Sequence, residues 1–95
     1  MKATRLFAAV FALLATDVLA ADQPPGAAAC TGCHAINART NTSVPRIQGR
    51  SAADIVAAMT AFKSGSRAST VMDRIAKGFN ENESQAIAVW FAGQK

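Results

Sequence analysis

Cys30-Thr31-Gly32-Cys33-His34 is the stretch of this sequence that decides the fold. It has the form C-x-x-C-H, the attachment motif of a c-type haem. The spacing suits this chemistry because two thiols one helical turn apart can bond to the two vinyl groups on one edge of a porphyrin. Cys30 and Cys33 are therefore predicted to hold one covalent haem c through thioether bonds. His34, the only histidine of the chain, is predicted to be the proximal iron ligand.

Three other interpretations of the two cysteines are open at this point. A structural zinc site needs four ligands, whereas Cys30, Cys33 and His34 supply three and the chain has no second C-x-x-C pair. A thioredoxin-like redox pair requires a strand before the motif, but residues 24–29 contain only Pro, Gly and Ala. The third alternative is a plain disulfide in a protein without haem.

The N-terminal segment is typical of a secretory signal peptide. Lys2 and Arg5 precede an apolar run over residues 6–15, and small residues stand where a signal peptidase reads the chain. Cleavage after about Ala20 would leave a single domain of residues 21–95 in the periplasm. The apolar run is half of the roughly 20 residues that span a bilayer, so no stable membrane span is expected in the mature chain.

The expected mature chain has few side chains with which to build a core. Only 15 apolar residues other than Ala and Cys remain in residues 21–95. Burial of each large side chain stabilises the folded state by about 1.5–3 kcal/mol. Ordering the chain costs about 1.5 kcal/mol of conformational entropy per residue, and this cost applies to every residue. A bonded haem would supply the missing apolar surface. Six residues are predicted to pack near or around it: Ile55, Phe62, Val71, Ile75, Trp90 and Phe91.

The hydrophobic pattern predicts helices and no strand. The first helix is expected over residues 26–34, after a proline at the first helical position. Ser51 and Asp54 resemble a capping box that begins a second helix ending at Gly65. Ser69 is expected to cap a short helix through residue 76, and Asn80 a final helix with an apolar face. Residues 35–50 are predicted to form a polar loop.

Three or four helices that follow an N-terminal haem motif resemble the plan of the class I cytochromes c. The resemblance implies an all-α fold wrapped around one covalently attached haem, with the first and last helices in close contact. The segment Val44-Pro45-Arg46-Ile47-Gln48-Gly49 resembles a Gly-Pro-x-Leu-x-Gly stretch of that class, with Val44 in place of the usual glycine. The resemblance implies that the Pro45 carbonyl accepts a hydrogen bond from His34 and orients its ring.

The expected mature chain offers two methionines as a second axial ligand, Met59 and Met72. Met59 is in register with Ile55 and Phe62 on a helical face, where a methionine usually belongs to the core. Met72 follows a polar loop that can bring its thioether to the far side of a haem, so Met72 is the predicted distal ligand. Met59 and an open or differently filled iron site are the alternatives.

A narrower resemblance is carried by the segments 61–65, 68–72 and 74–79, which read AFKSG, ASTVM and RIAKGF. They resemble the haem domain of flavocytochrome c sulfide dehydrogenase. That resemblance implies that Met72 is the distal ligand and that electrons pass from a flavoprotein (FAD) subunit through the haem to an acceptor cytochrome or oxidase. The chain itself would then carry no catalytic residue. The alternatives are a free-standing periplasmic electron shuttle and a haem enzyme or gas-binding module with an open iron site.

The net charge of +4 does not indicate nucleic-acid binding, because export removes that partner. Basic residues gather in two segments, one before the second helix and one around Met72. They are expected to neutralise the haem propionates or to steer an acidic redox partner, with a merely solvated surface as the alternative. These residues are Arg39, Arg46, Arg50, Lys63, Arg67, Arg74 and Lys77.

Overall fold

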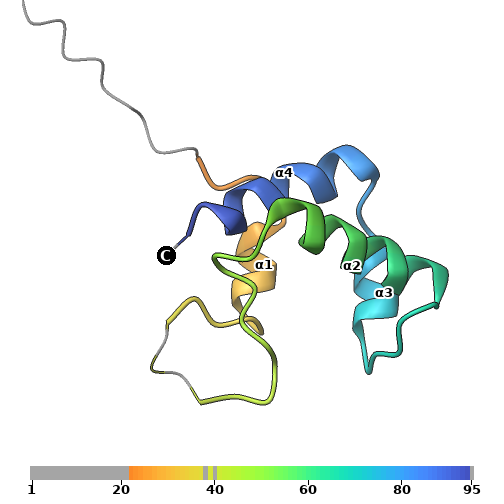
Figure 1. The fold of residues 1–95 in the computed structure, drawn as a ribbon, viewed down its shortest axis with the longest axis horizontal. Helices are drawn as coiled ribbons and strands as arrows, with labels where there is room; N and C mark the ends of the chain where they lie inside the picture. Colours follow the sequence, from red (N-terminus) through yellow and green to blue (C-terminus); the bar gives the residue numbers. More distant parts are fainter. Residues whose placement is uncertain (1–21, 38, 40, 95) are drawn as a thin grey trace, which may run out of the picture.

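The computed structural model describes residues 22–37, 39 and 41–94, and all regular elements within these ranges are helices (Figure 1). They are α1 (Ala27–Thr31), α2 (Ala52–Ser64), α3 (Met72–Ala76) and α4 (Glu81–Ala92). The prediction of an all-α chain is confirmed for this part of the molecule. The predicted signal peptide, residues 1–20, lies outside the described residues.

Helix α2 begins and ends where its sequence predicts. The Ser51 hydroxyl accepts a hydrogen bond from the backbone N–H of Asp54 at 3.1 Å, which satisfies one of the free donors of the first turn. Gly65 ends the helix in the left-handed conformation, with a φ of 77°, which a glycine adopts without steric cost. The end of α2 thus turns the chain directly into the loop that leads to Met72.

Helix α4 is closed at its start by a full capping box. Asn80 Oδ1 accepts from the Glu83 backbone N–H at 2.8 Å, and Glu83 Oε1 accepts from the Asn80 backbone N–H at 3.0 Å. The predicted role of Asn80 as the cap of the last helix is confirmed. The acidic side chains Glu81 and Glu83 also lie in the first turn, where the helix dipole favours negative charge.

The two short helices differ from their predicted bounds. Helix α1 ends at Thr31 rather than at residue 34, but the N–H groups of Cys33 and His34 both donate to the Cys30 carbonyl, at 3.1 and 2.7 Å. The motif therefore completes a helical turn without extending the helix. Helix α3 begins only at Met72, because Val71 has a non-helical φ of −137°. Ser69 still accepts from the Asp73 N–H at 3.0 Å, from outside the helix.

The packed core is small and joins the first helix to the last. Its buried members are Ala27, Ile55, Ile87, Ala88 and Phe91. In Figure 1, α2 runs beside α4, and α2 packs against both α3 and α4. The long loop before α2 is tied to the same core, since the Gly49 N–H donates to the Phe91 carbonyl at 2.9 Å. The loop and both terminal helices are thereby held in one unit.

Gly26 lies at a close contact between the start of α1 and the segment that joins α3 to α4. A Cβ atom at Gly26 would lie 2.5 Å from Cε1 of Phe79 and 3.4 Å from Cδ1 of Ile87. The neighbours of this small residue are thus Phe79 and Ile87. Ala27, the next residue, shares the buried core with Phe91.

Substitution Gly26→Ala is expected to destabilise the folded protein clearly. The positive φ of 90° costs a non-glycine residue about 1–2 kcal/mol, and overpacking against the Phe79 ring adds about 1–3 kcal/mol. Gly65→Ala is the matched control, because Gly65 also has a positive φ but a Cβ atom there would meet no neighbouring atom within 4 Å. Denaturant unfolding of both variants measures the difference, and equal losses would contradict the contact.

Candidate haem site

A cleft of about 850 Å³ lies beneath α2 and collects most of the residues that the sequence singled out. Its lining includes Cys30, Cys33 and His34 from α1 and the residues after it, and Met72 from α3. In Figure 1, α1 and the loop that follows it lie on one side of the space below α2, and α3 with the loop before it lies on the other. The two cysteines and His34 therefore come from one wall of the cleft, and Met72 comes from the opposite wall.

The α1 wall presents both cysteines as free thiols. Cys30 is half-buried and its Sγ donates to the Gly26 carbonyl at 3.4 Å, whereas Cys33 is exposed. Burial raises the pKa of the Cys30 thiol, and the nearby Cys33 adds to the rise against a backbone hydrogen bond that lowers it. The Cys30 side chain therefore lies in a less polar environment than the exposed Cys33.

His34 is oriented by the loop that precedes α2. Its Nδ1 atom lies 2.6 Å from the carbonyl oxygen of Pro45. A carbonyl oxygen only accepts hydrogen bonds, so this contact requires a proton on Nδ1, and the tautomer that carries its single proton there has the Nε2 lone pair available to a metal. The contact that the class I resemblance implies for Pro45 is therefore present in this chain.

Met72 is held by a loop that is fastened at both ends. The Arg67 N–H donates to the Ala61 carbonyl at 3.2 Å, and the Arg67 guanidinium lies 5.0 Å from the centre of the Phe62 ring. At the other end, the Ser69 hydroxyl bonds both the backbone N–H and the carboxylate of Asp73. The half-buried Met72 follows this loop as the first residue of α3.

Met59 also lines the cleft, but from a different direction. It lies in the middle of α2, the helix above the cleft, while Met72 begins α3 on the wall that faces α1 (Figure 1). Met72 therefore lies on the wall opposite His34, whereas Met59 comes from the helix above the cleft. Met72 as the distal ligand stays a prediction.

Four of the six apolar residues that were expected to pack near or around a haem line the cleft, and two do not. Ile55, Phe62, Val71 and Ile75 line the cleft, and Val71 and Ile75 are 52% and 42% exposed. Trp90 and Phe91 do not line it. Phe91 is fully buried in the core beside Ala27, and the Trp90 ring meets it edge-on at 4.9 Å between centroids. Phe91 thus belongs to the core cluster that includes Ala27 of α1, and the partly buried Trp90 packs against that cluster.

Two lining residues had no predicted part in the site. Phe79, named from the sequence only within the segment 74–79, lies in the cleft wall and against Gly26. Asp54, in the first turn of α2, is also a lining residue. Of the seven basic residues named from the sequence, Arg50 and Arg67 line the cleft and the other five do not.

The residues present fit a haem. A volume of about 850 Å³ is within the range of cofactor pockets, about 300–1,000 Å³. Two thiols and an imidazole lie at one wall, and a thioether lies at the other wall, where the exposed Val71 and Ile75 side chains add apolar surface to the lining. This donor set, a thiol pair with one His and one Met, is that of a c-type haem with two axial ligands.

The described residues show no equivalent site for a bare metal ion. Within residues 22–37, 39 and 41–94, no three His, Cys, Asp or Glu side chains are grouped so that they could hold one. The zinc alternative therefore has no complete ligand set in this region. The same region also contains no helix with the length and apolarity needed to cross a membrane.

The comparison with known proteins agrees with the resemblance noted from the sequence. The chain is 44% identical over 62 residues to a protein of Chlorobaculum tepidum described as the cytochrome subunit of sulfide dehydrogenase. The match covers 65% of this chain and 56% of that protein, so the chain spans little more than half of its relative's length. No family model matches the sequence. The chain thus resembles this cytochrome subunit, and the all-α fold of its described residues is consistent with a cytochrome c.

Proposed function

We propose that this chain is an exported single-haem c-type cytochrome that transfers electrons as the haem subunit of a sulfide dehydrogenase. One observation carries the proposal. The cleft has Cys30, Cys33 and His34 on one wall and Met72 on the opposite wall, with apolar side chains between them. The two thiols, the imidazole and the thioether suit a haem, which would use all four of these side chains.

Each named residue has a definite part in holding the cofactor. Cys30 and Cys33 would hold the haem through thioether bonds, and His34, through Nε2, and Met72 would ligate its iron. The bound haem supplies a one-electron iron couple. Pro45 fixes the tautomer and the orientation of His34 through the 2.6 Å contact, which also makes the ring a better electron donor to iron. A thioether opposite an imidazole raises the reduction potential.

The charged residues divide into two groups by position. Arg50 and Arg67 line the cleft, where their charges balance ionised propionates. Other basic side chains lie outside the cleft and are exposed, which suits the steering of an acidic partner surface. They are Arg39, Arg46, Arg74 and Lys77.

The partner follows from the resemblance to the sulfide dehydrogenase cytochrome subunit. A flavoprotein (FAD) subunit would oxidise sulfide and pass single electrons to the haem of this chain. The haem would then reduce an acceptor cytochrome or oxidase. Export would take the chain to the periplasm, with the signal peptide removed after about Ala20 and residues 21–95 left as one domain.

Purification of the native protein tests this assignment. We expect a complex that contains haem and FAD in equal amounts, in which sulfide reduces the haem only while the flavoprotein is present. A monomer without flavin that accepts electrons from other donors would point to a free-standing shuttle instead. Rapid CO binding, together with an oxidised spectrum that lacks a sulfur-to-iron charge-transfer band, would point to an open iron site and contradict electron transfer as the role.

A further inference from the structure

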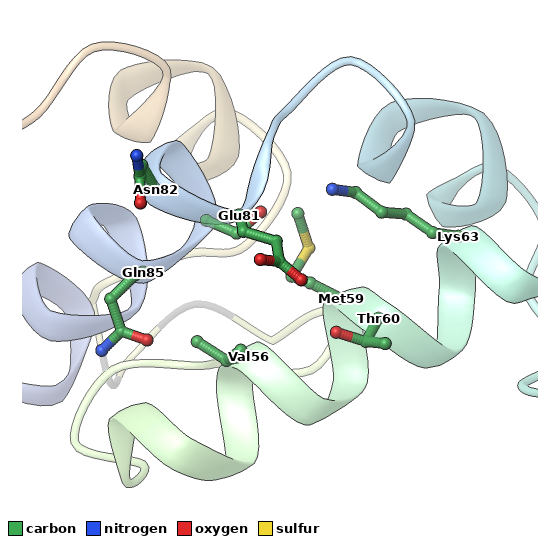
Figure 2. A pocket seen from close by; sticks show the side chains of 8 residues that line it. Val56, Met59, Thr60, Lys63, Glu81, Asn82 and Gln85 are labelled. Carbon is green, nitrogen blue, oxygen red and sulfur yellow. The ribbon is translucent and has the colours of Figure 1, made fainter.

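Lys63 is set apart from the other basic residues named from the sequence. Its side chain is partly buried, whereas those of the other six are exposed. It lines a small pocket between α2 and α4, and it runs from the last turn of α2 toward the loop that leads into α4 (Figure 2). Taking a charge out of water is costly unless the charge is paired or hydrogen-bonded. The position of Lys63 therefore calls for a specific partner.

That partner is the backbone of the segment between α3 and α4. Lys63 Nζ donates a hydrogen bond to the carbonyl oxygen of Phe79, 16 residues further along the chain. A hydrogen bond from an ammonium group is stronger than one between neutral groups. This bond fastens the C-terminal end of α2 to the junction of α3 and α4.

Phe79 is connected to both walls of the haem cleft. Its ring lines the cleft and lies against Gly26 at the start of α1, on the wall of the two cysteines. Its backbone continues from α3, because the Phe79 N–H donates to the Ala76 carbonyl at 3.2 Å. Helix α3 begins with Met72 on the other wall. The position of Phe79 therefore helps to set how α3 lies relative to α1.

We propose that Lys63 is a positioning residue of the haem site, which holds Phe79 between the two walls of the cleft and thereby keeps Met72 within reach of the iron. The inference rests on the proposed function. Without the Lys63 bond, the junction of α3 and α4 can move away from α2, and Met72 moves with α3. Ala76 is fully buried and still anchors α3, so the release of Met72 is a local event rather than unfolding.

Added imidazole measures how often Met72 leaves the iron of the oxidised holoprotein. Imidazole binds only where Met72 has left, so its apparent affinity is proportional to the fraction of protein in the released form. Loss of the sulfur-to-iron charge-transfer band follows this replacement. Denaturant unfolding measures the stability of the whole fold separately.

Lys63→Met removes the donor but keeps a long side chain. We expect the band to be present without imidazole, and the apparent affinity for imidazole to rise about tenfold, as for the loss of one hydrogen bond from a charged group. Lys63→Arg keeps the charge and the donors, so its affinity should stay within about twofold of that of the unmodified protein.

Ser51→Ala is the matched stability control, because it removes the side chain that caps α2 at the end remote from Lys63. It should lower the free energy of unfolding and leave the affinity for imidazole unchanged. An equal rise in affinity in Ser51→Ala and Lys63→Met would show that the affinity follows the stability of the fold, and would overturn the inference.

The remaining outcomes separate this inference from the proposed function. An unchanged affinity in Lys63→Met would overturn the inference and leave the proposed function intact. Absence of haem from the unmodified protein would overturn the proposed function, and this inference with it. If Lys63→Met does not take up haem, the uncharged variant Lys63→Gln replaces it. The affinity for imidazole should rise in that variant too, and an unchanged value would again overturn the role of Lys63.

Discussion

The double variant Cys30→Ala/Cys33→Ala is expected to lose the covalent haem and, with it, most of its native helix. The reason is the small size of the protein core, which has six buried apolar members in the described residues, three of them alanines. Outside that core, the apolar side chains of Phe62, Val71 and Ile75 line the cleft, and those of Val71 and Ile75 are exposed. Far-UV circular dichroism and a haem stain on a denaturing gel measure the two losses.

Thr31→Ala is the matched control for this experiment. Thr31 lies between the two cysteines, and its hydroxyl donates only to the Ala28 carbonyl within α1, at 2.8 Å. The control should therefore keep the haem and the helix signal. Full native helix content in the double cysteine variant would show that the chain folds without its cofactor, and would contradict this account of the fold.

The variant Met72→Ala is expected to leave the iron with a single axial ligand from the protein. The sulfur-to-iron charge-transfer band should disappear, and CO should bind rapidly to the reduced form. The reduction potential should fall by about 59 mV or more, a tenfold change in the redox equilibrium of a one-electron couple, because a Met opposite a His raises it. The fold should largely remain, since Met72 lies at the edge of the short helix α3.

Met59→Leu is the control for the distal ligand. Both methionines line the cleft, so only their positions separate them: Met59 comes from α2 and Met72 from the wall that faces α1. A Met59→Leu variant that keeps the band, beside a Met72→Ala variant that loses it, supports the assignment. The reverse result would move the distal ligand to Met59.

Local signals predicted the helices of this chain well. Ser51 and Asn80 accept the hydrogen bonds that their positions before α2 and α4 predict, and Gly65 ends α2 in the left-handed conformation. The motif Cys30 to His34 and the segment around Pro45 are likewise local patterns, and the structure brings them together through one contact of 2.6 Å. These features depend on neighbours in the sequence, which is why the sequence reveals them.

The sequence did not predict the contacts that depend on tertiary packing. Trp90 and Phe91 have the pattern of an apolar helical face, and nothing in that pattern tells whether the face meets a cofactor or another helix. The structure places Phe91 in the core cluster with Ala27, and neither Trp90 nor Phe91 lines the cleft. The place of Phe79 against Gly26 is also a contact between distant segments, for which spacing gives no signal.

The mass of the purified, exported protein tests the central claim most directly. Our account predicts one species, equal to the chain that begins after about Ala20 plus one haem, and this mass must survive denaturation because the thioether bonds of Cys30 and Cys33 are covalent. A polypeptide mass without haem, with the two cysteines as thiols or as a disulfide, would contradict the account.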